Sequence, residues 1–408
     1  MVERLDAPQP VYPLPPLENI PDEAEDKPLT DKLIITSFGE YGLPAVIFGA
    51  ATFSAFYNTD DQVSGVTPLR TTRLALRYGI RAFDTSPYYG PSEIILGNAL
   101  KTLENEFPRS SYQLLTKCGR YGNTRADFDL TPEGIRASVQ RSLTRLHTDY
   151  LDTVYVHDVE FIAYNKAPKT QGNHLSALDT EKEAYGLAEG QEAIAYGDGD
   201  TEILGAISEL MKLKDEGIIR RVGISGYPLP TLLRLAILVL HSGPCKPLDV
   251  VMSYCHLNLQ NRTVENFKAA FLERAKVKQV ISASPFSMGL LAPQPPAWHP
   301  APEDVKKAAK EAVERCAEWP GNEEGYSALP TLALEYAFER ARRAKIPTVV
   351  GLSSLKDVHE SAQMWYEVEE GALGKEADWN ERVNAVTDLF RDRGLLDYSW
   401  ENPAFSSG

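Results

Sequence analysis

Three ionisable side chains stand where short hydrophobic runs of this sequence end: Asp84, Lys117 and His157. Each run is typical of a buried strand, and a charge at the end of a buried strand needs a partner. Tyr88 and Tyr89 follow Asp84 closely. Because neighbouring parallel strands bring their ends together, we expect a carboxylate, an ammonium, an imidazole and a phenol at one site.

That combination suits proton transfer. A tyrosine with a pKa of about 10 is a poor acid or base near neutrality, and a nearby cation lowers its pKa. Asp84 would hold Lys117 charged beside the phenol, and His157 would orient a carbonyl or hydroxyl oxygen. The alternative is a structural Asp84–Lys117 ion pair with no catalytic role.

Eight short apolar runs alternate with amphipathic helical patterns. The predicted strands are Val46–Gly49, Ala82–Thr85, Gln113–Lys117, Thr153–His157, Arg221–Ser225, Val250–Ser253, Gln279–Ala283 and Thr348–Gly351. The predicted helices cover 66–78, 92–105, 132–146, 201–216, 229–241, 263–275, 328–343 and 355–366. This alternation predicts an α/β fold, a (β/α)8 TIM barrel, although a doubly wound sheet also accommodates it. The barrel is favoured because no Gly-x-Gly-x-x-Gly follows any strand.

The segments outside this repeat set the expected boundaries. Residues 1–31 are rich in proline and acids and predict an extended or disordered arm; 32–374 form the barrel, and 375–408 a C-terminal extension. Two insertions, at about 160–200 and 292–325, follow strands. Loops after strands lie over the C-terminal mouth of a barrel, so we expect long loops there. They are either two solvated loops or a partial lid, with Trp298 and His299 as substrate wall.

Composition narrows the partners. The chain has 408 residues and a formal charge of −15, which argues against nucleic acid or an anionic membrane as the main partner. We expect no membrane span, no signal peptide and a cytoplasmic location. The cysteines (Cys118, Cys245, Cys255 and Cys316) are scattered, which predicts neither a disulfide framework nor a metal site.

Several motifs resemble those of the aldo-keto reductase family. They are GIRAFDTSPYYGPSE at 79–93, LTRLHTDYLD at 143–152 before His157, and GISG at 223–226. The resemblance covers roughly residues 35–370. It implies a catalytic tetrad of Asp84, Tyr89, Lys117 and His157, with Tyr89 as acid and base; Tyr88 is the rival tyrosine.

Within the family, the chain is most similar to the D-arabinose 1-dehydrogenase and L-galactose dehydrogenase group. The segments that carry this likeness are YVHDVEF at 155–161, SYCH at 253–256, SASPFSMGLL at 282–291 and PPAWHP at 295–300. The resemblance implies oxidation of the anomeric carbon of an aldose to a lactone, with a nicotinamide cofactor. The expected pocket walls are Phe53, Tyr57, Trp298 and His299.

The resemblance also implies a cofactor site around GLSSLKDVHES at 351–361. Its expected residues are Ser225, Ser284, Pro285, Gly351, Ser353, Ser354, Lys356, Asp357 and Ser361. NADP-using relatives usually carry arginine at the position of Asp357, and a carboxylate there would repel a 2′-phosphate. This favours NAD, while Lys356 leaves NADP open. Ser361 and Met252 depart from the family's usual asparagine and glutamine.

The sequence therefore predicts an NAD-dependent aldose dehydrogenase that acts on D-arabinose, L-galactose or a similar sugar, as a monomer or homodimer. Two alternatives remain open. One is an NADPH-dependent aldehyde or ketone reductase. The other is a non-catalytic subunit that senses nucleotide, as some relatives do for channels.

Overall fold

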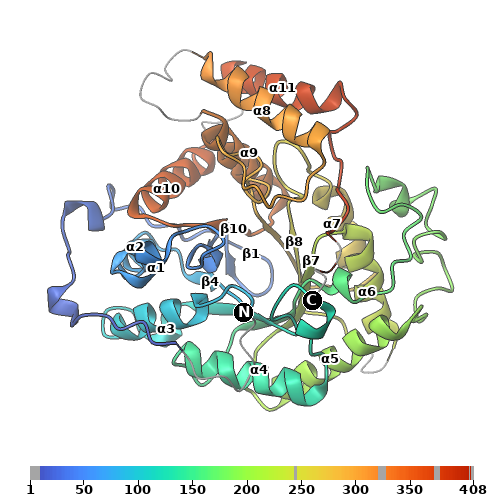
Figure 1. The fold of residues 1–408 in the computed structure, drawn as a ribbon, viewed down its shortest axis with the longest axis horizontal. Helices are drawn as coiled ribbons and strands as arrows, with labels where there is room; N and C mark the ends of the chain where they lie inside the picture. Colours follow the sequence, from blue (N-terminus) through green and yellow to red (C-terminus); the bar gives the residue numbers. More distant parts are fainter. Residues whose placement is uncertain (1–9, 243–245, 320–327, 372–376, 404, 406–408) are drawn as a thin grey trace.

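The barrel strands form one closed parallel sheet. The computed structural model describes residues 10–242, 246–319, 328–371, 377–403 and 405. The strands are β3 Val46–Gly49, β4 Ala82–Asp84, β5 Gln113–Cys118, β6 Thr153–Val156, β7 Val222–Gly226, β8 Val250–Tyr254, β9 Gln279–Ala283 and β10 Thr348–Gly351. Neighbours pair in chain order, and β10 closes the barrel against β3 (Figure 1). The predicted barrel is confirmed, with every strand within one residue of its expected bounds.

Helices surround this barrel. They are α1 Asp60–Ser64, α2 Thr67–Arg77, α3 Ser92–Thr102, α4 Pro132–Arg145, α5 Asp198–Asp215, α6 Leu229–His241, α7 Val264–Glu273, α8 Glu303–Ala317, α9 Ala328–Ala344, α10 Leu355–Glu369 and α11 Ala377–Arg391. Local sequence sets their starts. Thr131 caps α4 by accepting a hydrogen bond from the amide of Gly134, and proline occupies the first helical position. A short antiparallel hairpin, β1 Ser37–Phe38 with β2 Leu43–Pro44, precedes the barrel.

Alternation along the strands decides which side chains fill the barrel. A separate interior cluster contains Leu43, Ile47, Ala82, Leu115, Tyr155, Val250, Met252, Ile281 and Val349. Intervening residues such as Val154 and Ile224 join the larger core between sheet and helices. Since strand side chains repeat every two residues, the next inward positions are Asp84 on β4, Lys117 on β5 and His157 after β6. The fold thus places these polar groups one layer above an apolar floor.

The first insertion lies mainly at the side of the barrel. Residues 160–200 lie on the flank of the barrel beside α6 (Figure 1). Arg234 of α6 binds buried Asp200 and the carbonyl of Tyr164, and Arg274 after α7 binds the carbonyl of Leu187. These contacts explain why the insertion stays at the side.

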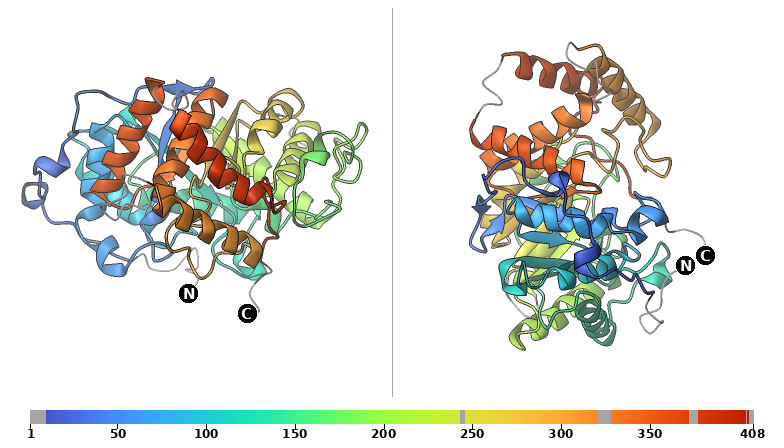
Figure 2. Two further views of the ribbon diagram at one scale, coloured as in Figure 1. Left: turned by 90° about the horizontal axis from the view of Figure 1, so that it is seen from above. Right: turned by 90° about the vertical axis from the view of Figure 1, so that its left-hand side faces the viewer.

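The second insertion contains a helix where a loop was expected. Its residues 303–317 form α8, which packs with α9 and α11 outside the ring (Figure 2). The buried positions of α8 are mostly small, namely Val305, Ala308, Ala309, Ala312 and Cys316. Such a narrow apolar stripe allows close helix packing. The lid stays a prediction for the part before α8, where Trp298 packs on Tyr57, and residues 320–325 lie outside the described part.

The C-terminal segment crosses the mouth instead. Ser399 pairs with Gly172 in a β-bridge and binds His256 through its hydroxyl. Trp400 stacks on Tyr227, with ring centroids 5.0 Å apart. These partners all follow barrel strands, so the segment spans loops from several strands at the carboxyl end of the sheet.

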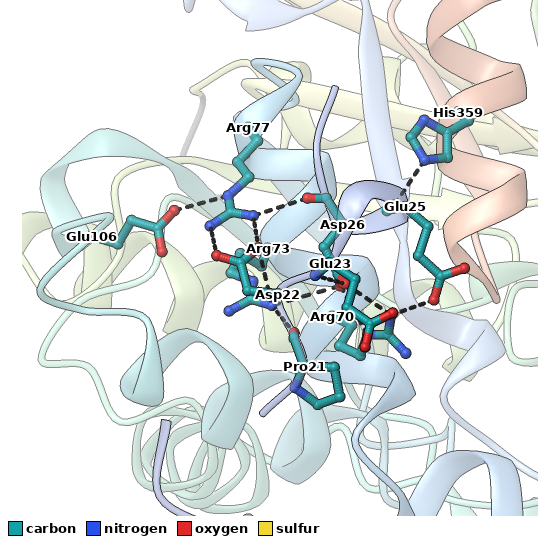
Figure 3. A network of polar contacts seen from close by, with 10 residues as sticks. All are labelled: Pro21, Asp22, Glu23, Glu25, Asp26, Arg70, Arg73, Arg77, Glu106 and His359. Carbon is teal, nitrogen blue, oxygen red and sulfur yellow. Dashed lines mark hydrogen bonds and ion pairs between the residues drawn. The ribbon is translucent and has the colours of Figure 1, made fainter. Parts of the chain in front are cut away.

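The N-terminal arm is fastened to α2. Its residues 10–31 are extended apart from two single-turn 3-10 helices, Leu17–Asn19 and Ala24–Asp26. Buried Asp26 accepts two hydrogen bonds of 2.8 Å from Arg70, and Arg77 binds Asp22 (Figure 3). Burial raises the pKa of Asp26, but hydrogen bonds from Arg70 and the Glu23 amide, together with the charges of Arg70 and Arg73, leave that pKa below its usual value.

We expect Asp26→Asn to loosen the arm, because it leaves the guanidinium of Arg70 without its buried carboxylate. The loss should be about 1.5–3 kcal/mol, seen as a lower melting temperature and faster proteolysis near residue 26. The matched control is Glu25→Gln, which removes an exposed carboxylate from the same arginine and should change stability little. Equal losses in both variants would contradict this account.

Candidate active site

A buried ion pair forms the base of the site. The Nζ atom of Lys117 lies 2.6 Å from Oδ1 of Asp84 and donates a 2.9 Å hydrogen bond to the carbonyl of Thr85. Both side chains are at most 5 % exposed. Burial raises the pKa of Asp84, while the charge and hydrogen bond of Lys117 act in the opposite direction. The pair fixes an ammonium at the floor of the barrel mouth.

The structure distinguishes the two tyrosines. The ammonium of Lys117 lies 4.7 Å from the ring centroid of Tyr89. Tyr88 instead lies under Arg120, at 4.1 Å, and its hydroxyl hydrogen-bonds to Asn123. Tyr89 is therefore the tyrosine that shares the pocket with Lys117, and both rings pack edge-on against His157.

The pKa of Tyr89 is shifted against our expectation. It is raised well above its usual value, first by burial and then by the negative charges of Asp84 and Asp158. The ammonium of Lys117 is engaged by Asp84 and does not outweigh these effects. Tyr89 consequently holds its proton at neutral pH in this arrangement, which is the form of a general acid.

His157 is held as a neutral imidazole. Its Nδ1 lies 3.0 Å from the hydroxyl of Ser86, and its Nε2 lies 3.4 Å from Oδ2 of Asp158. Burial, followed by the charges of Lys117 and Arg120, lowers the pKa of His157 well below its usual value. A neutral ring can orient a substrate oxygen without adding charge to the pocket.

Sequence reasoning missed the charged groups behind this histidine. Arg120 pairs with Asp158, and half-buried Glu160 lies nearby and accepts a hydrogen bond at its Oε1 from the hydroxyl of Tyr254. Burial and the charge of Asp158 raise the pKa of Glu160 to about 8. The available signal was position, since Arg120 and Asp158 follow the ends of β5 and β6. These groups add hydrogen-bonding capacity at the mouth.

Four predicted cofactor residues line one cavity. Gly351, Lys356, Asp357 and Ser361 border a space of about 330 Å³ between α9, α10 and the loop after β9. Glu360 lines it as well, 3.8 Å from Lys356. The cavity therefore holds two carboxylates and one ammonium.

Ser353 and Ser354 belong to the start of α10 rather than to the cavity wall. Oδ2 of Asp357 accepts hydrogen bonds from both of their amides, at 2.8 and 3.0 Å, and Ser354 caps the helix in return. This capping box satisfies amides that could otherwise bind a phosphate. Asp357 thus acts on the helix end and contributes negative charge beside the cavity.

The remaining cofactor candidates lie at strand ends. Ser225 is near the end of β7, and its buried hydroxyl has no hydrogen-bond partner within the described chain. Ser284 follows β9 with a left-handed backbone (φ 60°), and Pro285 comes next. An orphaned hydroxyl at the mouth and a polar cavity beyond it fit an extended nucleotide cofactor, with hydrogen-bonding groups at both ends.

The expected pocket walls separate into two kinds. Tyr57 and Trp298 are exposed and pack edge to face, with ring centroids 5.9 Å apart. Phe53 is buried against Phe48, and His299 is buried with both ring nitrogens bound to the main chain. Only the first pair presents aromatic surface to a ligand, whereas Phe53 and His299 support the wall from behind.

The described residues were also compared with what a metal site, a membrane span or a disulfide would need. No group of three or more His, Cys, Asp or Glu is placed to hold a metal ion there. Likewise, none of the helices described is long and apolar enough to cross a membrane. Cys118, Cys255 and Cys316 are buried and none of the three is in a disulfide, and Cys245 lies outside the described residues.

Known proteins are similar to this chain in sequence and in fold. The D-arabinose 1-dehydrogenase of Saccharomyces cerevisiae is 36% identical over 327 residues, which is 79% of this chain and 83% of the relative. The L-galactose dehydrogenase of Arabidopsis thaliana is 34% identical over 365 residues, or 88% and 95% of the two chains. A glycerol dehydrogenase structure from Gluconobacter oxydans, 21% identical, covers 94% of this chain and all of its own, with a TM-score of 0.54.

The family model for aldo/keto reductases matches residues 45–370. That range contains the whole barrel together with the ion pair, Tyr89 and His157. The chain therefore belongs to the aldo-keto reductase family of oxidoreductases, which use nicotinamide cofactors.

Proposed function

We propose that this protein oxidises the anomeric carbon of an aldose, such as D-arabinose or L-galactose, to the aldonolactone with NAD+. The observation that carries the proposal is the convergence of Asp84, Lys117, Tyr89 and His157 at one barrel mouth. The names of the two sugar dehydrogenase relatives support the choice of substrate class.

In the proposed reaction the sugar enters as a cyclic hemiacetal. Tyr89, as the phenolate, takes the proton of the anomeric hydroxyl, and neutral His157 holds that oxygen in line. A nicotinamide, when bound, would supply the acceptor for the hydride from C1. Lys117, fixed by Asp84, provides the positive charge that stabilises the phenolate before it takes this proton. The chain itself thus orients the sugar and moves the proton.

The charge balance of the cofactor cavity supports NAD. Asp357 and Glu360 oppose the single ammonium of Lys356, so a 2′-phosphate would meet net negative charge. The start of α10 also offers fewer free amides, because Asp357 already binds two of them. A ribose hydroxyl, in contrast, can donate to either carboxylate.

One observation favours the reverse reaction as a second candidate. Because the pKa of Tyr89 is raised, the tyrosine is protonated at neutral pH and is ready to act as an acid on a carbonyl. Reduction of an aldehyde or ketone uses that form. Parallel assays in both directions separate the two candidates, and cofactor binding without turnover in either would favour the nucleotide-sensing alternative.

Tyr89→Phe should lower aldose oxidation by about 10²–10⁴-fold, because it removes the proton carrier. The rate of NADH formation at 340 nm measures this. Tyr88→Phe is the matched control, since it removes a hydroxyl bonded to Asn123 from the neighbouring ring, while Tyr89 is the ring beside Lys117. We expect it to retain most activity, and a larger loss in Tyr88→Phe would assign the role to the other tyrosine.

The pH dependence follows from the raised pKa of Tyr89. Oxidation needs Tyr89 as the phenolate, which accepts the proton, and this form becomes more abundant only as pH rises. We expect kcat/KM for oxidation to increase from pH 6 to 10, and kcat/KM for carbonyl reduction to fall at the alkaline end. His157 has a lowered pKa and should not titrate in this range. A bell-shaped oxidation profile centred near pH 6 would refute the assignment.

Asp357→Asn should relax cofactor preference. Removing the carboxylate's charge weakens the repulsion of a 2′-phosphate, so the ratio of kcat/KM for NADP+ to that for NAD+ should rise about tenfold. Glu381→Gln removes one exposed carboxylate from α11 and serves as the charge-matched control. An unchanged ratio in Asp357→Asn, or wild-type preference for NADP+, would overturn the cofactor proposal.

A further inference from the structure

A second groove lies at the end of the barrel opposite the catalytic groups. It has a volume of about 650 Å³. Several of its lining residues lie at the starts of barrel strands: Arg81 directly before β4, Ser111 two residues before β5, Asp152 directly before β6 and Arg221 directly before β7. The catalytic groups instead occupy the carboxyl ends of the same strands. The groove is therefore separated from the active site by the filled interior of the barrel.

Positive charge exceeds negative charge around this groove. Asp152 is its one acidic lining residue. Three arginines lie within ion-pairing distance of this carboxylate. Arg109 and Arg220 bind it at 2.8 and 2.9 Å, and Arg221 lies 3.9 Å away. The excess of cations is notable in a chain with a formal charge of −15. One carboxylate cannot neutralise three guanidinium groups.

Arg81 increases this imbalance. Its Nη1 atom is buried without a hydrogen-bond partner, and within the described chain no carboxylate pairs with it. Its guanidinium lies over the ring of Phe107, 5.1 Å from the centroid. Burial lowers the pKa of Arg81, as expected for a cation without a compensating anion.

A second orphaned polar atom lines the same groove. The hydroxyl of Ser111 is buried and has no partner in the described structure. Buried polar atoms usually find hydrogen bonds, so two unsatisfied donors on residues that line one groove indicate a missing acceptor. Ile34 and Tyr112 provide apolar wall beside them.

We infer that this groove is a ligand site for a small organic anion, whose phosphate or carboxylate group binds Arg81 and Ser111 beside Arg221. A guanidinium offers a planar fork of donors that matches either group. The apolar wall and the volume leave room for a body larger than the anionic group alone. The site would be independent of the proposed dehydrogenase reaction.

The test is a calorimetric titration of the full chain with inorganic pyrophosphate or with citrate, at constant ionic strength. We expect saturable binding of at least one anion with a stoichiometry of one. Arg81→Gln should weaken it at least about tenfold, and Ser111→Ala should weaken it less. Tighter binding of pyrophosphate would indicate a phosphate ester as the natural ligand, and tighter binding of citrate a carboxylate.

Two controls locate the site. Arg315→Gln removes an exposed arginine from α8 and should leave the affinity unchanged. Lys356→Gln alters the candidate cofactor cavity and should also leave it unchanged. Absence of binding in the wild type, or binding that Lys356→Gln abolishes while Arg81→Gln does not, would overturn the inference.

Stability distinguishes a binding role from a structural one. Arg81→Gln removes an unpaired charge, so its melting temperature without anion should match or exceed that of the wild type. Pyrophosphate or citrate should then raise the melting temperature of the wild type but not of the variant. A large drop in the melting temperature of Arg81→Gln without anion would instead show that Arg81 stabilises the fold, and would contradict a binding role.

Discussion

The buried ion pair between Lys117 and Asp84 is the interaction on which the catalytic end of this barrel depends. Neither charge could remain inside the sheet alone, because desolvation of a single ion costs several kcal/mol. Pairing at 2.6 Å resolves this and fixes the ammonium near Tyr89. The apolar layer below, with Leu115 and Tyr155, excludes water from beneath the pair.

The mouth above this pair is bordered by segments that come late in the chain. The C-terminal residues lie across the loops after several strands, where Trp400 contacts both Tyr227 and His299. The insertion at 160–200 is instead tied to the flank through the Arg234–Asp200 ion pair. Distant parts of the sequence thus cooperate to form one mouth, while the opposite end of the barrel keeps its own cationic groove.

Much of the fold could be predicted because strand periodicity and caps such as Thr131 are local signals. The stripe of small residues in α8 was also visible, but a proline-rich preceding segment suggested a loop. The destination of an insertion is a tertiary property, so the side position of residues 160–200 could not be predicted. The site predictions followed strand ends, whereas Arg120 lies two residues beyond the end of β5 and its pairing with Asp158 depends on how the loops after β5 and β6 meet. The raised pKa of Tyr89 depends on burial, which the sequence does not display.

The central claim is that this strand-end site removes hydride from the anomeric carbon. The most direct measurement supplies L-galactose or D-arabinose deuterated at C1, with NAD+, and follows the label by mass spectrometry and NMR. The account predicts deuterium in the reduced nicotinamide, an unlabelled lactone and slower turnover than with unlabelled sugar. Turnover of these sugars in which deuterium remains on the sugar product, or no turnover of either by folded protein that binds NAD+, would contradict it.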